Sequence, residues 1–168
     1  GGSGLIGKNV VKSLISLNAK VFNLDIKNIS IKNKNYNFKY FDCTKLHELE
    51  SKIDLLVKKF GCPKILINCS YPYTNDWKLS NFENVKLNNM RKNVDIHLNS
   101  YAWISKLIAD KMKKNKKKGS IINMSSIYGV VGQDLTIYKN TPMKENFTYS
   151  IVKGGIVSFT RQMASYYG

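Results

Sequence analysis

The chain has little arginine and no apolar run long enough to cross a membrane. Only Arg91 and Arg161 are arginines, although lysine and arginine together number 27 and the formal net charge is +16. Arginine is the residue that best forks onto phosphates and base edges, and the lysines are spread along the whole chain. The run at 113–118 is typical of a solvated helix end and loop. We therefore expect neither a nucleic-acid partner nor a membrane partner.

Cysteine and histidine are also scarce. Cys43, Cys62 and Cys69 are odd in number and lack the paired spacing of a metal site. We expect Cys62 and Cys69 to be reduced core thiols, which fits a cytoplasmic protein. His47 and His97 are not spaced as metal ligands either, so both are expected on helix surfaces. The sequence predicts no bound metal.

The chain is long enough for one domain with a sizeable core. It does not begin with methionine, its first residues GGSGLIG read as the interior of a motif, and it ends directly after a helical pattern. We therefore expect residues 1–168 to form a single domain that is incomplete at both ends. The missing parts would be its first strand and a C-terminal portion.

Short apolar segments alternate along the chain with longer helical ones. Strands are expected at residues 20–26, 37–41, 64–69 and 119–124, and helices at residues 7–18, 44–60, 92–114 and 150–166, with Thr44 as a helix cap. This order predicts an α/β fold, a Rossmann-like doubly wound parallel sheet with helices on both faces. Ligands of such sheets bind beyond the carboxyl ends of the strands, where Asp25, Asn68 and Ser126 are expected.

A glycine-rich turn opens the chain. Gly1, Gly4 and Gly7 recur every third residue at the expected start of a helix, and this spacing lets the backbone approach a pyrophosphate. Asp25 ends the next expected strand, where an acid would accept hydrogen bonds from an adenosine ribose. Each feature alone also fits an ordinary turn or a solvated strand end. Together they predict dinucleotide binding.

Tyr149 and Lys153 are four residues apart in the last expected helix, so the phenol and the ammonium would share one face. A cation beside a phenol favours the phenolate, the form that acts as a general base. Ser126, in the pair Ser125–Ser126 after an apolar run, would hold a carbonyl or an alcohol while its proton moves. The three residues predict an acid–base site.

With these motifs in order, the chain resembles the short-chain dehydrogenase/reductase family over essentially its whole length. The resembling segments are Gly1–Gly7, Asp25, Asp42–Cys43, Asn68–Ser70, Asn99, Ile122–Ser126 and Tyr149–Lys153. The resemblance implies that the nicotinamide cofactor is held by Gly1, Ser3, Gly4, Leu5, Ile6, Gly7, Asp25, Asp42, Cys43, Asn68, Cys69, Ser70, Tyr149 and Lys153. It implies catalysis by Asn99, Ser126, Tyr149 and Lys153.

Individual roles follow from the same resemblance. Asp25 would bind the adenosine ribose and favour NAD over NADP, and Asp42 would lie against the adenine. Asn68 would stand at the strand end beside the nucleotide. Asn99 would hold a water in the proton path, and Lys153 would also contact the nicotinamide ribose. Taken singly, Asn99 also fits a locally paired helix amide, Asn68 a strand-end cap and Asp42 a turn acid.

The chain departs from the family pattern in two places. Asn68–Tyr71 stands where single-domain members usually have Asn-Asn-Ala-Gly, which alters the wall beside the nucleotide. Extra residues at Gln133–Lys144 separate Ser126 from Tyr149, and we expect them to form part of a substrate lid.

Several activities remain open on this pattern. The mixture of features resembles bacterial oxidoreductases of flagellin or surface-sugar modification. This implies a small-molecule substrate, a secondary alcohol or ketone, with a sugar derivative as one candidate. The resemblance also implies a homo-oligomer, a dimer or a tetramer. The alternatives are a nucleotide-sugar epimerase or dehydratase of the extended branch, and a non-catalytic dinucleotide-binding protein.

Overall fold

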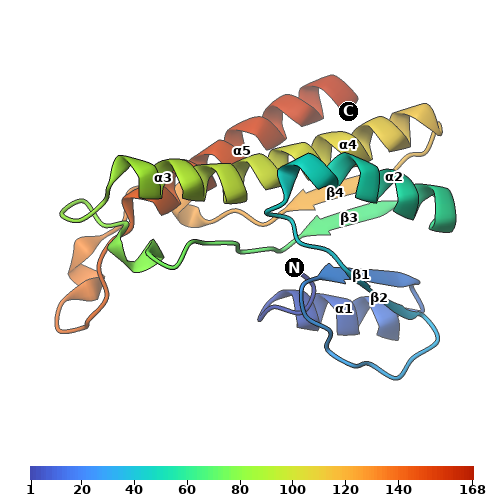
Figure 1. Cartoon of the computed structure of the whole chain (residues 1–168), viewed down its shortest axis with the longest axis horizontal. Helices are drawn as coiled ribbons and strands as arrows, with labels where there is room; N and C mark the ends of the chain where they lie inside the picture. Colours follow the sequence, from blue (N-terminus) through green and yellow to red (C-terminus); the bar gives the residue numbers. More distant parts are fainter.

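The computed structural model describes all residues 1–168 and alternates strands with helices in the expected order (Figure 1). The elements are α1 (Gly7–Ser16), β1 (Val21–Asp25), β2 (Tyr36–Tyr40), α2 (Leu49–Phe60), β3 (Ile65–Asn68), α3 (Leu87–Asn93), α4 (Ser100–Lys114), β4 (Ser120–Asn123) and α5 (Phe147–Tyr167). A π-helical turn, Val94–Asn99, joins α3 to α4. None of the helices combines the length and the apolarity that a bilayer span requires.

The strands are parallel, as predicted, and form two separate pairs. β1 pairs with β2, from Val21 opposite Tyr36 to Asp25 opposite Tyr40, and β3 pairs with β4. No strand lies between β1 and β3. The turn at Gly1 lies there instead: its nitrogen donates to the carbonyl of Leu24 at 2.7 Å. A Cβ on Gly1 would lie 2.2 Å from the nitrogen of Ser70, so the turn also touches the end of β3.

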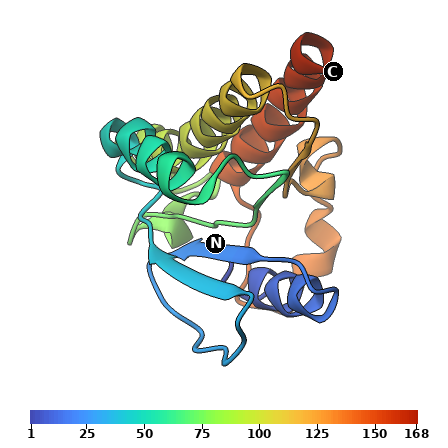
Figure 2. The ribbon, with the colours of Figure 1, turned by 90° about the vertical axis from the view of Figure 1, so that its right-hand side faces the viewer.

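Helices lie on both sides of the strands (Figures 1 and 2). α1 lies on one side of β1 and β2, and α2, α4 and α5 lie on the other side, over β3 and β4. The largest core cluster joins α2 to α4, and Leu66 and Ile121 of the second strand pair pack against it. A smaller cluster packs α1 on β1 through Val11, Ile15 and Val21. The α/β architecture and the two-sided cover were therefore predicted correctly.

Several helix boundaries differ from those expected from the sequence. The long helix starts at Leu87 instead of residue 92, and the last helix starts at Phe147. Thr44 does not cap a helix: it donates its N–H and its hydroxyl to Asp42, and α2 begins five residues later. Gly61, with φ of +86°, ends α2 as expected because this backbone region favours glycine.

The burial of the cysteines and of the two histidines can be compared with the predictions. The three cysteines are free thiols, as expected, although all are only half-buried. His47 is exposed on the surface as expected, but His97 is fully buried, so the prediction for it was wrong. The reason is its helical phase: His97 follows Val94 by three residues and precedes Tyr101 by four, which places it on the packed face of the helix.

Candidate active site

Tyr149 and Lys153 lie one turn apart in the first part of α5. Asn146 caps this helix, and its Oδ1 accepts the backbone N–H of Tyr149 at 2.7 Å. The Nζ of Lys153 lies 5.6 Å from the centre of the Tyr149 ring. The capped first turn therefore fixes the backbone of Tyr149, and the helical spacing brings the Lys153 ammonium beside the phenol.

Lys153 is a buried cation with few polar partners. Only 3% of the residue is exposed, and its Nζ donates to the carbonyl oxygen of Met124 at 2.9 Å. Burial lowers the pKa of Lys153 from 10.5 to about 8, and the nearby Cys69 thiol offsets part of that decrease. The side chain is thus still mostly an ammonium near neutral pH.

Aromatic rings surround this ammonium. Its Nζ lies 5.7 Å from the ring centre of Tyr71 and 5.6 Å from that of Tyr101. The Tyr101 hydroxyl donates to the carbonyl of Ser70 at 2.8 Å, at the end of β3. Burial, followed by the neighbouring Tyr149, raises the pKa of Tyr71 to about 12, so this phenol stays neutral. The rings face the cation with their electron-rich surfaces, which favours the charged form.

The serine pair follows β4 and packs against α5. The Ser125 hydroxyl donates to the carbonyl oxygen of Lys153 at 2.8 Å. The Ser126 Oγ accepts the N–H of Tyr128 at 3.2 Å and caps a short 3-10 turn, which leaves its hydroxyl hydrogen for another acceptor. Gly129 lies so close that a Cβ there would be 2.7 Å from the Lys153 oxygen. Ser125 and Gly129 therefore hold the Ser126 segment against α5.

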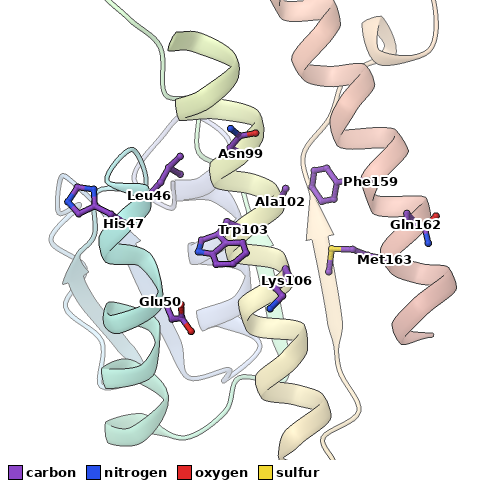
Figure 3. Close-up of a pocket in the computed structure, with 10 residues that line it drawn as sticks. All are labelled: Leu46, His47, Glu50, Asn99, Ala102, Trp103, Lys106, Phe159, Gln162 and Met163. Carbon is purple, nitrogen blue, oxygen red and sulfur yellow. The ribbon is translucent and has the colours of Figure 1, made fainter. Parts of the chain in front are cut away.

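Asn99 is not brought to this site. Its side chain is exposed and donates to Asp95 on the outer face of the helix at 2.9 Å. It lines an open groove between α2, α4 and α5, together with Trp103 and Phe159 (Figure 3). Of the four expected catalytic residues, the structure brings Tyr149 and Lys153 together and places Ser126 on the segment that packs on their helix.

His97 lies on the inner face of the same π-helical turn. It is fully buried, and neither ring nitrogen has a hydrogen-bond partner. Its ring centre lies 5.1 Å from that of Tyr71 and 5.4 Å from that of Tyr101. Burial, followed by the charge of Lys153, lowers the pKa of His97 to about 3 and keeps the imidazole neutral. Its spacing from Val94 and Tyr101 was the signal that could have found it.

The glycine turn leaves no room for a side chain at Gly1, Gly2 or Gly7, whereas a Cβ at Gly4 would meet only ordinary contact. A Cβ on Gly7 would lie 2.1 Å from the carbonyl oxygen of Gly1, and one on Gly2 would lie 2.3 Å from the Asn23 side chain. The start of α1 has neither a side-chain cap nor an acid in its first turn. The helix dipole therefore favours an anion at this end, although the N–H groups of Lys8, Asn9 and Val10 already donate to the carbonyls of Gly4 and Ile6. Leu5 and Ile6 in this turn are exposed.

Asp25 lies at the end of β1, beside the turn. One of its oxygens accepts the N–H of Ser3 at 2.9 Å and the other accepts that of Lys27 at 3.1 Å. Burial alone would raise the pKa of Asp25, but the hydrogen bonds from the backbone N–H groups of Ser3 and Lys27 oppose it and hold the pKa below its usual value. The carboxylate is ionised and has acceptor capacity left.

The remaining expected cofactor residues lie at the ends of β2 and β3. Asp42 accepts both bonds from Thr44 through one oxygen, so it also acts as a turn acid. Asn68 is buried, and its Oδ1 accepts the Ser70 hydroxyl while its Nδ2 has no partner. Burial raises the pKa values of Cys43 and Cys69, which keeps both thiols protonated.

A dinucleotide fits the residues at this edge. The glycine turn at the start of α1 suits a pyrophosphate, Asp25 suits a ribose diol, and the unpaired Nδ2 of Asn68 suits a further polar contact. All three lie at the same end of the parallel strands as the tyrosine–lysine pair. The fold and the geometry define an α/β protein with a tyrosine–lysine pair and a glycine-rich turn at the same end of its parallel strands.

Comparison with known proteins identifies the family. The model of the short chain dehydrogenase family matches residues 1–168, and the chain belongs to this family. Post-translational flagellin modification protein A of Campylobacter coli is 30% identical over 115 residues, which cover 68% of the chain and 44% of that protein. An uncharacterised oxidoreductase of Schizosaccharomyces pombe is 26% identical over the whole chain and 59% of its own length.

Solved structures agree with this assignment. A short chain dehydrogenase from Leptospira borgpetersenii with bound NAD⁺ is 31% identical, with a TM-score of 0.84 over 100% of the chain and 65% of that protein. A 4-hydroxyisoleucine dehydrogenase complexed with NADH shares the fold at 21% identity, with a TM-score of 0.79 over 97% of the chain and 65% of its own. The chain thus spans less than two thirds of the length of these relatives.

Proposed function

We propose that the protein is a nicotinamide-dependent oxidoreductase that interconverts a secondary alcohol and its ketone. The observation that carries this proposal is the pair of Tyr149 with a buried Lys153 ammonium at the carboxyl ends of parallel strands. A binding protein without catalysis has no need of a buried cation beside a phenol, because burying it costs free energy. Residues 1–168 would form one cofactor-binding domain.

The protein residues would handle the proton. In the oxidising direction the Tyr149 oxygen takes the hydroxyl proton of the alcohol as the carbon–hydrogen bond breaks. The Lys153 ammonium stabilises the phenolate electrostatically, and Ser126 donates a hydrogen bond to the substrate oxygen. The bound nicotinamide supplies the hydride chemistry, accepting the hydride in this direction and giving it in the other.

The cofactor would be NAD in preference to NADP. Asp25 is ionised and would accept the ribose hydroxyls, whereas a 2′-phosphate would meet a like charge there. The relatives solved with NAD⁺ and NADH support this choice. Gly1, Ser3, Gly4, Leu5, Ile6 and Gly7 would cradle the pyrophosphate, and Asp42, Cys43, Asn68, Cys69 and Ser70 would line the nucleotide.

A sugar-derived substrate is the finer proposal, supported by the similarity to a flagellin modification protein. The segment Gln133–Lys144 would cover it as a lid. Lys144 forms an ion pair with Glu83, and the N–H of Asn146 donates to Gln133 at 2.7 Å. Phe82 and Phe147 pack edge to face with ring centres 5.0 Å apart, which ties both segments together.

The protein would act as a homo-oligomer in the cytoplasm. The groove between α2, α4 and α5 exposes Trp103 and is lined by Phe159 and Met163 (Figure 3), and a second copy would cover it. The free cysteines suit a reducing compartment. Trp103→Glu should then lower the oligomeric state in light scattering, and an unchanged mass would reject the groove as the interface.

The experiment that tests the activity is a substrate panel on the intact protein. Secondary alcohols and nucleotide sugars are offered with NAD⁺ and the appearance of NADH is followed by absorbance. We expect turnover with at least one secondary alcohol that depends on Tyr149 and Lys153. NADH binding without turnover of any alcohol or ketone would favour the non-catalytic alternative.

A further inference from the structure

The buried imidazole of His97 has no assigned role, although its position is costly. A buried polar atom without a partner costs about 1–3 kcal/mol, and both ring nitrogens of His97 are in this state. Asn99, which sequence analysis placed in the proton path, points to the outer groove instead. An apolar side chain at position 97 would be cheaper for folding alone.

His97 and Lys153 share their surroundings. Tyr71 and Tyr101 contact both, with the His97 ring 5.1 and 5.4 Å from their centres and the Lys153 Nζ 5.7 and 5.6 Å from the same centres. The two tyrosines donate nothing to His97, because neither ring nitrogen accepts a bond from the protein. The imidazole and the ammonium therefore face one aromatic enclosure.

The ammonium of Lys153 has N–H donors to spare, and the imidazole of His97 has an unused acceptor nitrogen. The only protein acceptor recorded for the three Lys153 N–H groups is the carbonyl of Met124. A neutral imidazole offers one acceptor nitrogen and one N–H donor. The other titratable groups around the pair are Tyr71, Tyr101 and Tyr149, and the Cys69 thiol faces Lys153. None of these is a carboxylate, so the Lys153 ammonium has only neutral acceptors around it, and the imidazole of His97 is the fully buried one among them that has no other partner.

We propose that His97 is a positioning residue for Lys153: one ring nitrogen accepts a hydrogen bond from a water that the ammonium also binds, and this bridge holds the ammonium beside Tyr149. The π-helical turn Val94–Asn99 supports the assignment, because such turns insert a residue into a helix and are frequent at functional sites. This inference depends on the proposed function only for its effect on turnover. The contact between His97 and Lys153 can be tested without a substrate.

The test is a titration of Lys153 in the intact protein labelled with lysine carrying ¹³C at Cε. The Lys153 resonance is the one that disappears in Lys153→Met. His97→Phe keeps an aromatic ring against Tyr71 and Tyr101 and removes both nitrogens. We expect the midpoint for Lys153 to fall by about one pH unit, since a hydrogen bond favours the charged form.

Rescue distinguishes a hydrogen bond from packing. The amide of Asn reaches the place of Nδ1 and that of Gln the place of Nε2, so one of His97→Asn and His97→Gln should restore most of the shift. His97→Leu is a second apolar variant in case the phenylalanine variant fails to fold. Asn99→Ala, on the outer face of the same turn, is the control and should leave the Lys153 titration unchanged.

The outcomes separate this inference from the proposed function. An unchanged Lys153 midpoint in the apolar variants, or a shift that neither amide rescues, would overturn the role of His97. The apolar variants should be less stable than the wild type near neutral pH, because they remove an acceptor that favours the Lys153 ammonium, and a variant more stable than the wild type would also speak against the role of His97. Failure of the wild type to bind NADH would reject the proposed function and leave the titration intact.

Discussion

The ammonium of Lys153 lies 5.6 Å from the ring centre of Tyr149, and both residues are held by the same short stretch of α5. The Ser125 hydroxyl donates a hydrogen bond to the carbonyl oxygen of Lys153, and the carbonyl oxygen of Met124 accepts one from the Lys153 ammonium. The end of β4 therefore holds the backbone and the side chain of Lys153. A change in this packing should alter the acid–base pair without touching it directly.

Asp25→Ser should exchange cofactor preference. The variant loses an acceptor for the ribose diol and a negative charge that opposes a 2′-phosphate, a repulsion that typically costs several kcal/mol. We expect NADH to bind about tenfold more weakly and NADPH to bind more tightly than to the wild type. Fluorescence titration with both cofactors measures this. Asp54→Ser, which removes an acid paired with Lys111 on α2 and α4, is the matched control.

The wild type itself provides the stricter test of Asp25. If it binds NADPH as tightly as NADH, the Asp25 carboxylate does not distinguish the ribose hydroxyls from a 2′-phosphate, and its assigned role is wrong.

Lys153→Met should stabilise the apo protein at neutral pH. Burial lowers the folded-state pKa of Lys153 to about 8, below its ordinary 10.5, so unfolding takes up a proton between these values. Below about pH 8 the folded state pays the whole cost of the buried ammonium, and the Lys153 contribution to stability rises as the pH increases toward 10.5. The variant should gain about 1–3 kcal/mol at pH 7, and the gain should shrink toward pH 10.5.

Urea unfolding of both proteins from pH 7 to 10.5 measures that difference, and the comparison cancels the other lysines. A variant less stable than the wild type at pH 7 would show that the ammonium contributes more through its contacts than it loses through burial.

Gly129→Ala should separate the serine segment from α5. The new Cβ would lie 2.7 Å from the Lys153 carbonyl oxygen and 3.1 Å from the Ser125 Oγ, closer than packing allows. We expect a loss of about 1–3 kcal/mol in stability and a lower turnover. Gly132→Ala is the control, since nothing lies within 4 Å of its Cβ. Equal melting temperatures for the two variants would contradict the close contact.

The sequence was sufficient for the order of the elements and for the paired residues of α5. Local spacing determines both, because a four-residue interval on a helix brings two side chains together wherever the helix lies. Local spacing does not determine which strands pair with which, since pairing depends on which strands lie side by side in space. The junction at Gly1 and Ser70 is a tertiary contact with no local pattern.

Asn99 and His97 illustrate a different limit of the sequence. Motif position favoured Asn99, whose side chain lies on the outer face of the turn, whereas the helical period places His97 with Val94 and Tyr101 on the buried face. Which face a residue of this turn occupies follows from its spacing to the neighbouring apolar residues, and the motif alone does not give it.

Tyr149→Phe tests the acid–base account most directly. The substitution removes only the hydroxyl, so the ring contacts with Tyr71 and Lys153 remain. With a secondary alcohol accepted by the wild type, single-turnover NADH formation should fall by about 10²–10⁴-fold, while NADH affinity and melting temperature stay as in the wild type. Near-full turnover in this variant would contradict the role of Tyr149 as the proton acceptor, and with it the central claim.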